Sequence, residues 1–328
     1  MLTKVGTGIL RLQVPMPFNM GAVNSYFVEG QSGYTVVDTG DNTMEAREVW
    51  KKVLAMDIPI EKIVVTHAHP DHLGLAAWFQ NEYGLPVWLS EEGHKELVRA
   101  RQMFMDDYED VMIPFALQHG AALYPPADDR SKQYYKPDTF QFEPDVLFKM
   151  GDDIRLGDAA FQVIWTPGHS EDHCCFYDQD SKIMFAGDHI LKNMNPIVTS
   201  RHMEDNPLQE YMESLDKIES CQTELVLPGH GELFENLAGR IAEMKSHYVK
   251  RWLQTYEAIG SEGKTAYDAS RIVYSNYTER RVMPAFLQTI TNLIYLESKG
   301  AVRWEKRDGK IFYFQVPSFR EALSSATV

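Results

Sequence analysis

Cysteine is scarce in this sequence, and no hydrophobic run is long. The 328 residues include only three cysteines, two of them adjacent, and three cysteines cannot stabilise a chain of this length through disulfide bonds. No apolar stretch is long enough to cross a bilayer, and the first ten residues lack the charged-then-apolar order of a secretory signal. We therefore expect Cys174, Cys175 and Cys221 to be reduced, and we expect a cytoplasmic protein without a membrane partner.

Basic residues are outnumbered by acidic ones. The sequence carries 32 lysine and arginine residues against 47 aspartate and glutamate residues, which gives a formal net charge of −15. The acidic excess lies entirely in residues 1–236, whereas residues 237–328 hold more basic than acidic side chains. An acidic body repels polyanions, so general nucleic-acid binding by the first part of the chain is disfavoured.

Several common catalytic motifs are missing. The sequence has no G-x-S-x-G nucleophile elbow, no H-E-x-x-H motif, no P-loop and no G-x-G-x-x-G motif. The chemistry must therefore come from another arrangement of side chains.

The hydrophobic pattern of residues 1–236 predicts a mixed α/β domain. The first forty residues are β-rich, and helical spacing follows over 41–57, with Asp41 or Asn42 as the expected N-cap. A strand over 62–66 and a helix ending near Gly84 come next, and the β-rich pattern returns after residue 146.

Residues 94–148 interrupt this alternation. A helical stretch leads into a segment rich in proline and aromatic residues, and methionines accompany both. Long segments of this kind inside a compact domain are often lids or binding elements. Simple packing explains the methionine and aromatic cluster equally well, so both interpretations are kept.

The stretch THAHPDH, residues 66–72, follows the predicted strand directly. His67 and His69 are two apart in extended chain and are expected to point to the same side. A helix beginning one residue later turns Asp71 and His72 toward a neighbouring point. One loop can therefore supply ligands to two adjacent metal centres.

Three more residues of ligand type are expected where strands end. They lie in glycine-flanked turns, which allow close backbone approach: TPGHS, AGDH and PGHG. Imidazole and carboxylate donors favour a first-row metal with four or five ligands. The count predicts two divalent ions, with zinc expected first and iron or manganese as alternatives. His67, His69 and His169 would bind one ion, Asp71, His72 and His230 the other, and Asp188 would bridge them.

The motifs THAHPDH, TPGHS, GDH and PGHG, in this order, resemble those of the metallo-β-lactamase-fold hydrolase superfamily. The resemblance covers residues 1 to about 236. It implies an αββα sandwich, in which two β-sheets pack face to face with helices outside. It also implies two metal ions bound by the seven residues named above.

Two metal ions that share a water can lower the pKa of that water from 15.7 to about 7. The predicted nucleophile is therefore a hydroxide between the ions. Asp71 is the predicted catalytic residue, because it can handle a proton at the attacking or the leaving atom. His173 and His189 lie close to ligands in the sequence and are candidates for orienting them.

Residues 237–328 predict three helices and a hairpin turning at Asp308-Gly309. This order suggests a winged-helix-like module, and with the THxHxDH motif it resembles the lactamase-like branch that includes endoribonucleases. The expected recognition helix, 284–299, has one basic residue, Lys299, whereas groove readers present several polar or basic side chains. The module is therefore expected to dock on the acidic residues 1–236 or to form a homodimer, rather than to bind RNA.

Three functions remain open from the sequence. The favoured one is hydrolysis of a small ester, thioester or lactone, with the 94–148 segment facing the acyl group. The alternative is a metal-dependent endoribonuclease or phosphodiesterase. The third is a metal-loaded regulatory or binding protein without turnover. The sequence does not select a substrate, because one fold can host several of these reactions.

Overall fold

The computed structural model describes residues 1–17, 20–103, 108–122, 136–276 and 279–317. The chain divides into two compact units. Unit 1 comprises Met1–Phe104, Ala127–Pro196 and Asp216–Leu237, and unit 2 comprises Met105–Pro126, Ile197–Leu215 and Ala238–Val328. Part of the 94–148 segment thus belongs to each unit, and the simple division at residue 236 stays a prediction.

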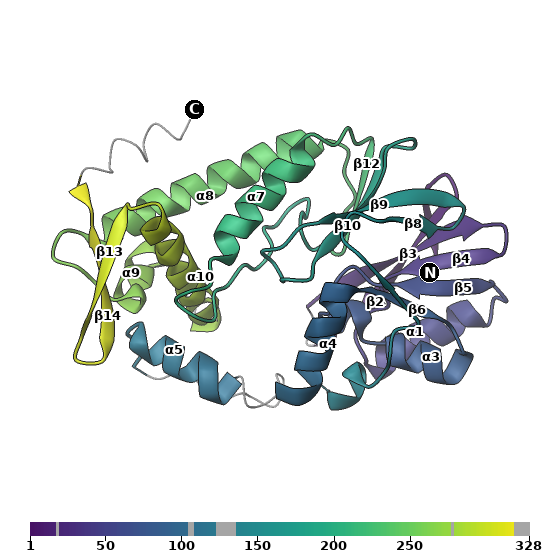
Figure 1. The fold of residues 1–328 in the computed structure, drawn as a ribbon, viewed down its shortest axis with the longest axis horizontal. Helices are drawn as coiled ribbons and strands as arrows, with labels where there is room; N and C mark the ends of the chain where they lie inside the picture. The colour runs from purple at the N-terminus through teal and green to yellow at the C-terminus, as the bar shows by residue number, and fades with distance from the viewer. Residues whose placement is uncertain (18–19, 104–107, 123–135, 277–278, 318–328) are drawn as a thin grey trace. The chain divides into compact units, whose positions relative to one another are not determined.

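Unit 1 contains a seven-stranded sheet whose strands follow one another in chain order. Figure 1 labels strands β2 to β6 of this sheet. Strands β1 to β4 pair antiparallel, and β4 to β7 pair parallel. The strands are β1 Thr3–Gly6, β2 Ile9–Pro15, β3 Ala22–Gly30, β4 Gly33–Val37, β5 Ile60–Val64, β6 Val87–Ser90 and β7 Val146–Phe148. Strands β3 and β4 are buried over most of their length because both faces of the sheet are covered.

A second sheet in unit 1 has five strands in the order β12-β11-β10-β9-β8. Its strands are β8 Asp153–Leu156, β9 Ala159–Trp165, β10 Cys174–Asp178, β11 Ile183–Gly187 and β12 Leu225–Pro228. The two sheets share one buried cluster, to which the first contributes Tyr26 and Val64 and the second contributes Phe161, Phe176 and Phe185. Burial of these side chains is the main force that holds the sheets together.

Helices cover the other face of the seven-stranded sheet. They are α1 Met44–Leu54, the short α2 Pro70–Leu73, α3 Ala76–Tyr83 and α4 Glu91–Met103, and a 3-10 turn, η3 Pro137–Phe140, lies among them. Trp50 of α1 is the centre of this contact, with its ring 4.8 Å from that of Phe79 and 5.5 Å from that of Phe27. The layering confirms the predicted α/β fold class.

The predicted cap of the first helix was wrong. Thr43, and neither Asp41 nor Asn42, caps α1, because its hydroxyl accepts a hydrogen bond from the backbone N–H of Ala46 at 3.0 Å. The end of α3 was predicted correctly. Gly84 follows it in the left-handed conformation, with a φ of 64°.

Unit 2 is mainly helical. Its elements are the π-helical turn η2 Tyr108–Met112, α5 Ile113–Gln118, most of α7 Pro207–Glu219, α8 Leu237–Ile259, α9 Ala266–Val273, α10 Glu279–Ser298 and the hairpin of β13 Val302–Arg307 with β14 Lys310–Gln315. The hairpin turns at Asp308 and Gly309, both with positive φ, as the sequence predicts. The helix expected over 284–299 begins five residues earlier and contains Pro284. The winged-helix assignment stays a prediction.

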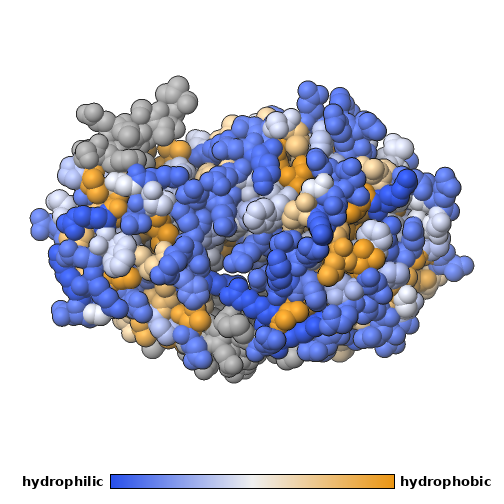
Figure 2. Space-filling view, in the orientation of Figure 1, coloured by the Kyte–Doolittle hydropathy of each residue, from blue (hydrophilic) through white to orange (hydrophobic). Residues whose placement is uncertain are grey.

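In the part of the chain that the structure describes, no helix is both long and apolar enough to span a membrane. On the side facing the viewer, Figure 2 shows mainly hydrophilic residues, with hydrophobic ones in separate patches. All three cysteines are free thiols, and Cys174 and Cys175 are buried in β10, as expected for small core residues.

Candidate metal centre

All seven residues predicted to bind metal lie in segments that directly follow strands of unit 1. His67, His69, Asp71 and His72 follow β5, and the last two belong to the short helix α2. His169 follows β9, Asp188 comes directly after β11, and His230 follows β12. The structure brings these residues into two groups, which have the composition that the sequence predicts except that Asp188 is counted with the second group.

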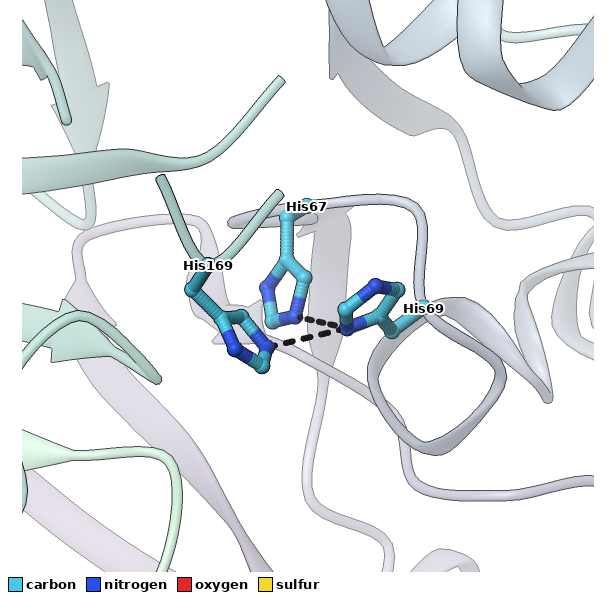
Figure 3. Close-up of side chains that lie close together, drawn as sticks. All are labelled: His67, His69 and His169. Atoms are coloured by element: carbon cyan, nitrogen blue, oxygen red, sulfur yellow. Dashed lines mark hydrogen bonds between the residues drawn. The ribbon is translucent and has the colours of Figure 1, made fainter. Parts of the chain in front are cut away.

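The first group consists of three imidazoles that point toward one another (Figure 3). Nδ1 of His69 lies 3.0 Å from Nε2 of His67 and 3.0 Å from Nε2 of His169. One ring nitrogen offers either a hydrogen or a lone pair, so Nδ1 of His69 cannot hydrogen-bond well to both rings. Ligands of a tetrahedral zinc ion lie about 3.3 Å apart, so the three nitrogens are close to the spacing that a shared ion requires.

The second group combines two carboxylates with two imidazoles. Nε2 of His230 lies 3.1 Å from Oδ2 of Asp71 and 3.3 Å from Oδ2 of Asp188, and Nε2 of His72 lies 3.4 Å from Oδ1 of Asp188. Oδ2 of Asp188 is also 3.7 Å from Nε2 of His169 in the first group. Asp188 therefore lies between the two groups, as a bridging ligand would.

The environment of the second group fits a metal ion. Nε2 of His72 and Oδ1 of Asp188 are buried and face each other at 3.4 Å, but neither atom makes a well-formed hydrogen bond among the described residues. A buried pair of this kind is costly, and a bound cation would compensate for both atoms. Gly229 keeps the space open, because a Cβ there would lie 2.4 Å from Oδ1 of Asp188 and 2.7 Å from Cε1 of His72.

The electrostatics differ between the groups. Burial, reinforced by neighbouring imidazoles, lowers the pKa of His67 well below its usual value and that of His69 to about 3. His67 and His69 are therefore neutral imidazoles, which is the form that binds metal.

In the second group, ion pairing outweighs burial. Burial alone would lower the pKa of His72 and His230, but the carboxylates raise that of His72 well above its usual value and that of His230 to about 10. Burial alone would raise the pKa of Asp71 and Asp188, but the facing imidazoles lower both. Without a metal ion, the two imidazoles thus hold protons that an ion would have to displace.

Asp38, which the sequence analysis did not single out as functional, orients one imidazole of each group. Its Oδ2 lies 2.8 Å from Nδ1 of His72 and accepts a hydrogen bond from the Thr66 hydroxyl at 2.9 Å. The Thr66 oxygen in turn lies 3.0 Å from Nδ1 of His67. Nε2 of both histidines is thereby left for a metal ion. Asp38 stands where β4 ends, so the rule that found the other residues could have found it.

His173 and Asp172 support the loops that carry the ligands. Nε2 of His173 accepts a hydrogen bond from the backbone N–H of Asp188 at 3.0 Å, and its Nδ1 lies 2.8 Å from Oγ1 of Thr166. These contacts are those expected of a residue that orients Asp188. Asp172 accepts a hydrogen bond from the backbone N–H of Ala68 at 2.7 Å, between the first two ligands. His189 is buried, with its ring 5.9 Å from that of His173.

Two stacked sheets whose edge is rich in histidine and aspartate define a class of metal-dependent hydrolases. Comparisons with known proteins place this chain in that class. The sequence pattern of the Metallo-beta-lactamase superfamily matches residues 19–230, so the chain belongs to this superfamily. The predicted family, fold class and enzyme class, metal-dependent hydrolase, are thereby confirmed.

Two relatives and one solved structure match nearly the whole chain. A probable metallo-hydrolase of Bacillus subtilis is 26% identical over 94% of this chain and 97% of its own length. An atrochrysone carboxyl ACP thioesterase of Passalora fulva is 27% identical over 97% of this chain and 84% of its own length. A metallo-beta-lactamase family protein from Thermus thermophilus, known from its crystal structure, is 27% identical in sequence to this chain. The match has a TM-score of 0.78 and covers 94% of this chain and 99% of the other.

Proposed function

We propose that the protein is a binuclear metal-dependent hydrolase that cleaves a small thioester or a related ester or lactone. The observation that carries this proposal is the position of Asp188, whose Oδ2 lies 3.3 Å from His230 and 3.7 Å from His169. A carboxylate in contact with two ligand groups is suited to hold two ions at the short separation that lets them share a substrate or a water.

Two divalent ions bound here would supply an activated water at neutral pH and polarise the scissile carbonyl. His67, His69 and His169 would hold one ion, and Asp71, His72 and His230 the other. Asp38 and His173 keep the ligands oriented through the hydrogen bonds described above. With its pKa held low by His72 and His230, Asp71 is ionised at neutral pH, which is the form that both metal binding and proton acceptance require.

In the proposed reaction the water oxygen bonds to the carbonyl carbon of the substrate. Asp71 takes the proton that the water loses and passes it to the leaving sulfur or oxygen as the carbon–heteroatom bond breaks. The products are a carboxylic acid and a thiol or alcohol, so atoms and charge balance without another reactant. The role of Asp71 therefore combines metal binding with proton transfer.

The preference for a thioester rests on the relatives. The Passalora fulva protein is named a thioesterase, and this chain aligns with most of its length. A thiolate is also a better leaving group than an alkoxide, so thioester cleavage depends less on protonation of the leaving atom. RNA cleavage is the competing function, and the same assay can test it.

The test is hydrolysis of a panel of acyl thioesters, esters and lactones by protein of measured metal content, with single-stranded RNA as the comparison. We expect thioester turnover that is lost on chelation and in His69→Ala, Asp71→Ala and Asp188→Ala. His94→Ala serves as a control, because His94 lies on α4 and its Nε2 is 3.3 Å from a carboxylate oxygen of Glu143, which belongs to neither group. Metal-dependent RNA cleavage without thioester cleavage would overturn the proposed substrate class. Near-normal turnover in a metal-loaded ligand variant would overturn the assigned residues.

A further inference from the structure

The loop that carries His230 is held by side chains of β3, and none of these was singled out by the sequence. We propose that Asn24 and Tyr26 are positioning residues that fix His230, and with it the second group of ligands. This inference rests on the proposed function, since it concerns the ion that His230 would help to bind.

Asn24 hydrogen-bonds to the backbone on both sides of His230 through its one side-chain amide. Its side chain is fully buried, and its Nδ2 donates hydrogen bonds of 3.0 Å to the carbonyl oxygens of Pro228 and Gly231. Both hydrogens of the amide are therefore used on the residues that flank Gly229 and His230. Each of these bonds joins segments more than two hundred residues apart in the chain.

Tyr26 adds a third hydrogen bond to the same loop. Its hydroxyl donates to the carbonyl oxygen of Pro228 at 2.7 Å, and the ring is buried against Phe185, with ring centroids 5.4 Å apart. Burial raises the pKa of this phenol, so it remains a donor throughout the physiological range. Asn24 and Tyr26 are two apart on β3 and point to the same side of the strand.

The backbone of β3 completes the arrangement. The N–H of Asn24 donates to the carbonyl of Gly229 at 2.7 Å, and Nδ1 of His230 lies 3.0 Å from the carbonyl oxygen of Ala22. A carbonyl can only accept, so Nδ1 carries the hydrogen, and Nε2 is the atom that faces Asp71 and Asp188. The strand thereby sets both the position and the tautomer of His230.

A loop of sequence PGHG needs such support. Its two glycines have more conformational freedom than other residues, and Gly231 adopts a φ of 74°. Gly229 must stay a glycine, because its Cβ would collide with Asp188 and His72. The two glycines give the loop little rigidity of their own, so the hydrogen bonds from β3 supply it together with the one from the N–H of Gly229 to the carbonyl of Gly187 at 2.6 Å.

Tyr26→Phe is the sharpest test, because it removes one oxygen atom and keeps the buried ring. Asn24→Ala removes the other two side-chain donors. Val28→Ala is the matched control, since Val28 is a buried core residue of the same strand and its side chain cannot hydrogen-bond to the loop. Crystals of metal-free protein are equilibrated with graded concentrations of Zn²⁺, and anomalous scattering gives the occupancy at each of the two positions.

Both variants should need a higher Zn²⁺ concentration to fill the position next to His230, about 10- to 100-fold higher for Asn24→Ala. The position among His67, His69 and His169 should fill as in the wild type, and Val28→Ala should change neither occupancy. Equal filling of the second position in wild type and Tyr26→Phe, or a parallel loss at both positions, overturns the proposal. If the wild type binds no metal at either position, the proposed function fails instead.

If Asn24→Ala does not fold, Tyr26→Phe decides the question. A merely structural role predicts a lower melting temperature in the variants, as in Val28→Ala, with unchanged relative occupancy of the two positions. The ratio of occupancies is therefore the readout that separates positioning from stability.

Discussion

Oδ2 of Asp38 lies 2.8 Å from Nδ1 of His72, and the same oxygen accepts a hydrogen bond from the Thr66 hydroxyl, whose oxygen lies 3.0 Å from Nδ1 of His67. One carboxylate thus orients an imidazole in each group of ligands. Carboxylates in this position fix the tautomer of a ligating histidine and make it a better donor to the metal.

Asp38→Asn should therefore weaken metal binding at both positions, by about 10- to 100-fold. The amide is neutral and cannot stabilise the imidazoles as the carboxylate does. Metal titration of the chelator-treated protein measures the effect. Asp57→Asn is the control, because Asp57 also has a positive φ, of 56°, but is exposed. Unchanged affinity in Asp38→Asn would contradict the role assigned to Asp38.

Gly229→Ala should abolish binding at the second position. The added Cβ would lie 2.4 Å from Oδ1 of Asp188, and overpacking of this kind costs about 1–3 kcal/mol in folding free energy as well. Equilibrium unfolding and metal content are the measurements. Gly151→Ala is a useful comparison, since Gly151 has a positive φ but open space around its Cβ position, so backbone strain alone is tested there. A Gly229→Ala protein with full metal content would refute the steric argument.

Metal binding at the second position should release protons. The carboxylates hold the pKa of His230 at about 10 in the metal-free protein, so this imidazole is protonated at pH 8, and they raise the pKa of His72, which favours its protonated form. A metal ion binds only the neutral form, so loading must expel these protons, and the apparent affinity must fall as the pH is lowered. Calorimetric titration in buffers of different ionisation enthalpy counts the protons. Binding heats that do not depend on the buffer would contradict this prediction.

Stability should depend on the protonation of Asp172. Burial raises its pKa from 3.8 to about 7, so the folded protein favours the protonated carboxyl more than the unfolded chain does. Asp172 contributes fully to the free energy of unfolding below about pH 4, and this contribution is lost as the pH rises through 7. The loss is at most about 1.4 kcal/mol per unit of difference between the pKa in the folded and in the unfolded protein.

Asp172→Asn removes this titration and keeps an oxygen that can accept the N–H of Ala68. Relative to the variant, the wild type should lose unfolding free energy as the pH rises from 5 to 8. The comparison cancels the pH dependence of metal binding, which both proteins share. Denaturant unfolding at a series of pH values measures the difference, and parallel curves would show that Asp172 does not titrate in this range.

The sequence by itself determined the local features of the site. The spacing of His67, His69, Asp71 and His72 follows from a strand that ends in a helix, and the glycine-flanked turns mark where His169 and His230 lie. The resemblance of these motifs to one superfamily also gave the layered fold. Local periodicity and turn chemistry were sufficient for these predictions, because each depends on residues a few positions apart.

Only the tertiary structure decided which distant residues meet. The contact of Asp38 with His72 spans 34 positions, and those of Asn24 with Pro228 and Gly231 span 204 and 207. Such contacts depend on how two sheets pack face to face, and no local pattern encodes them. For the same reason the sequence did not reveal that residues 197–215 group with the C-terminal helices. The start of α10 was missed for a local reason, because proline is common at the first position of a helix and Pro284 lies inside this one.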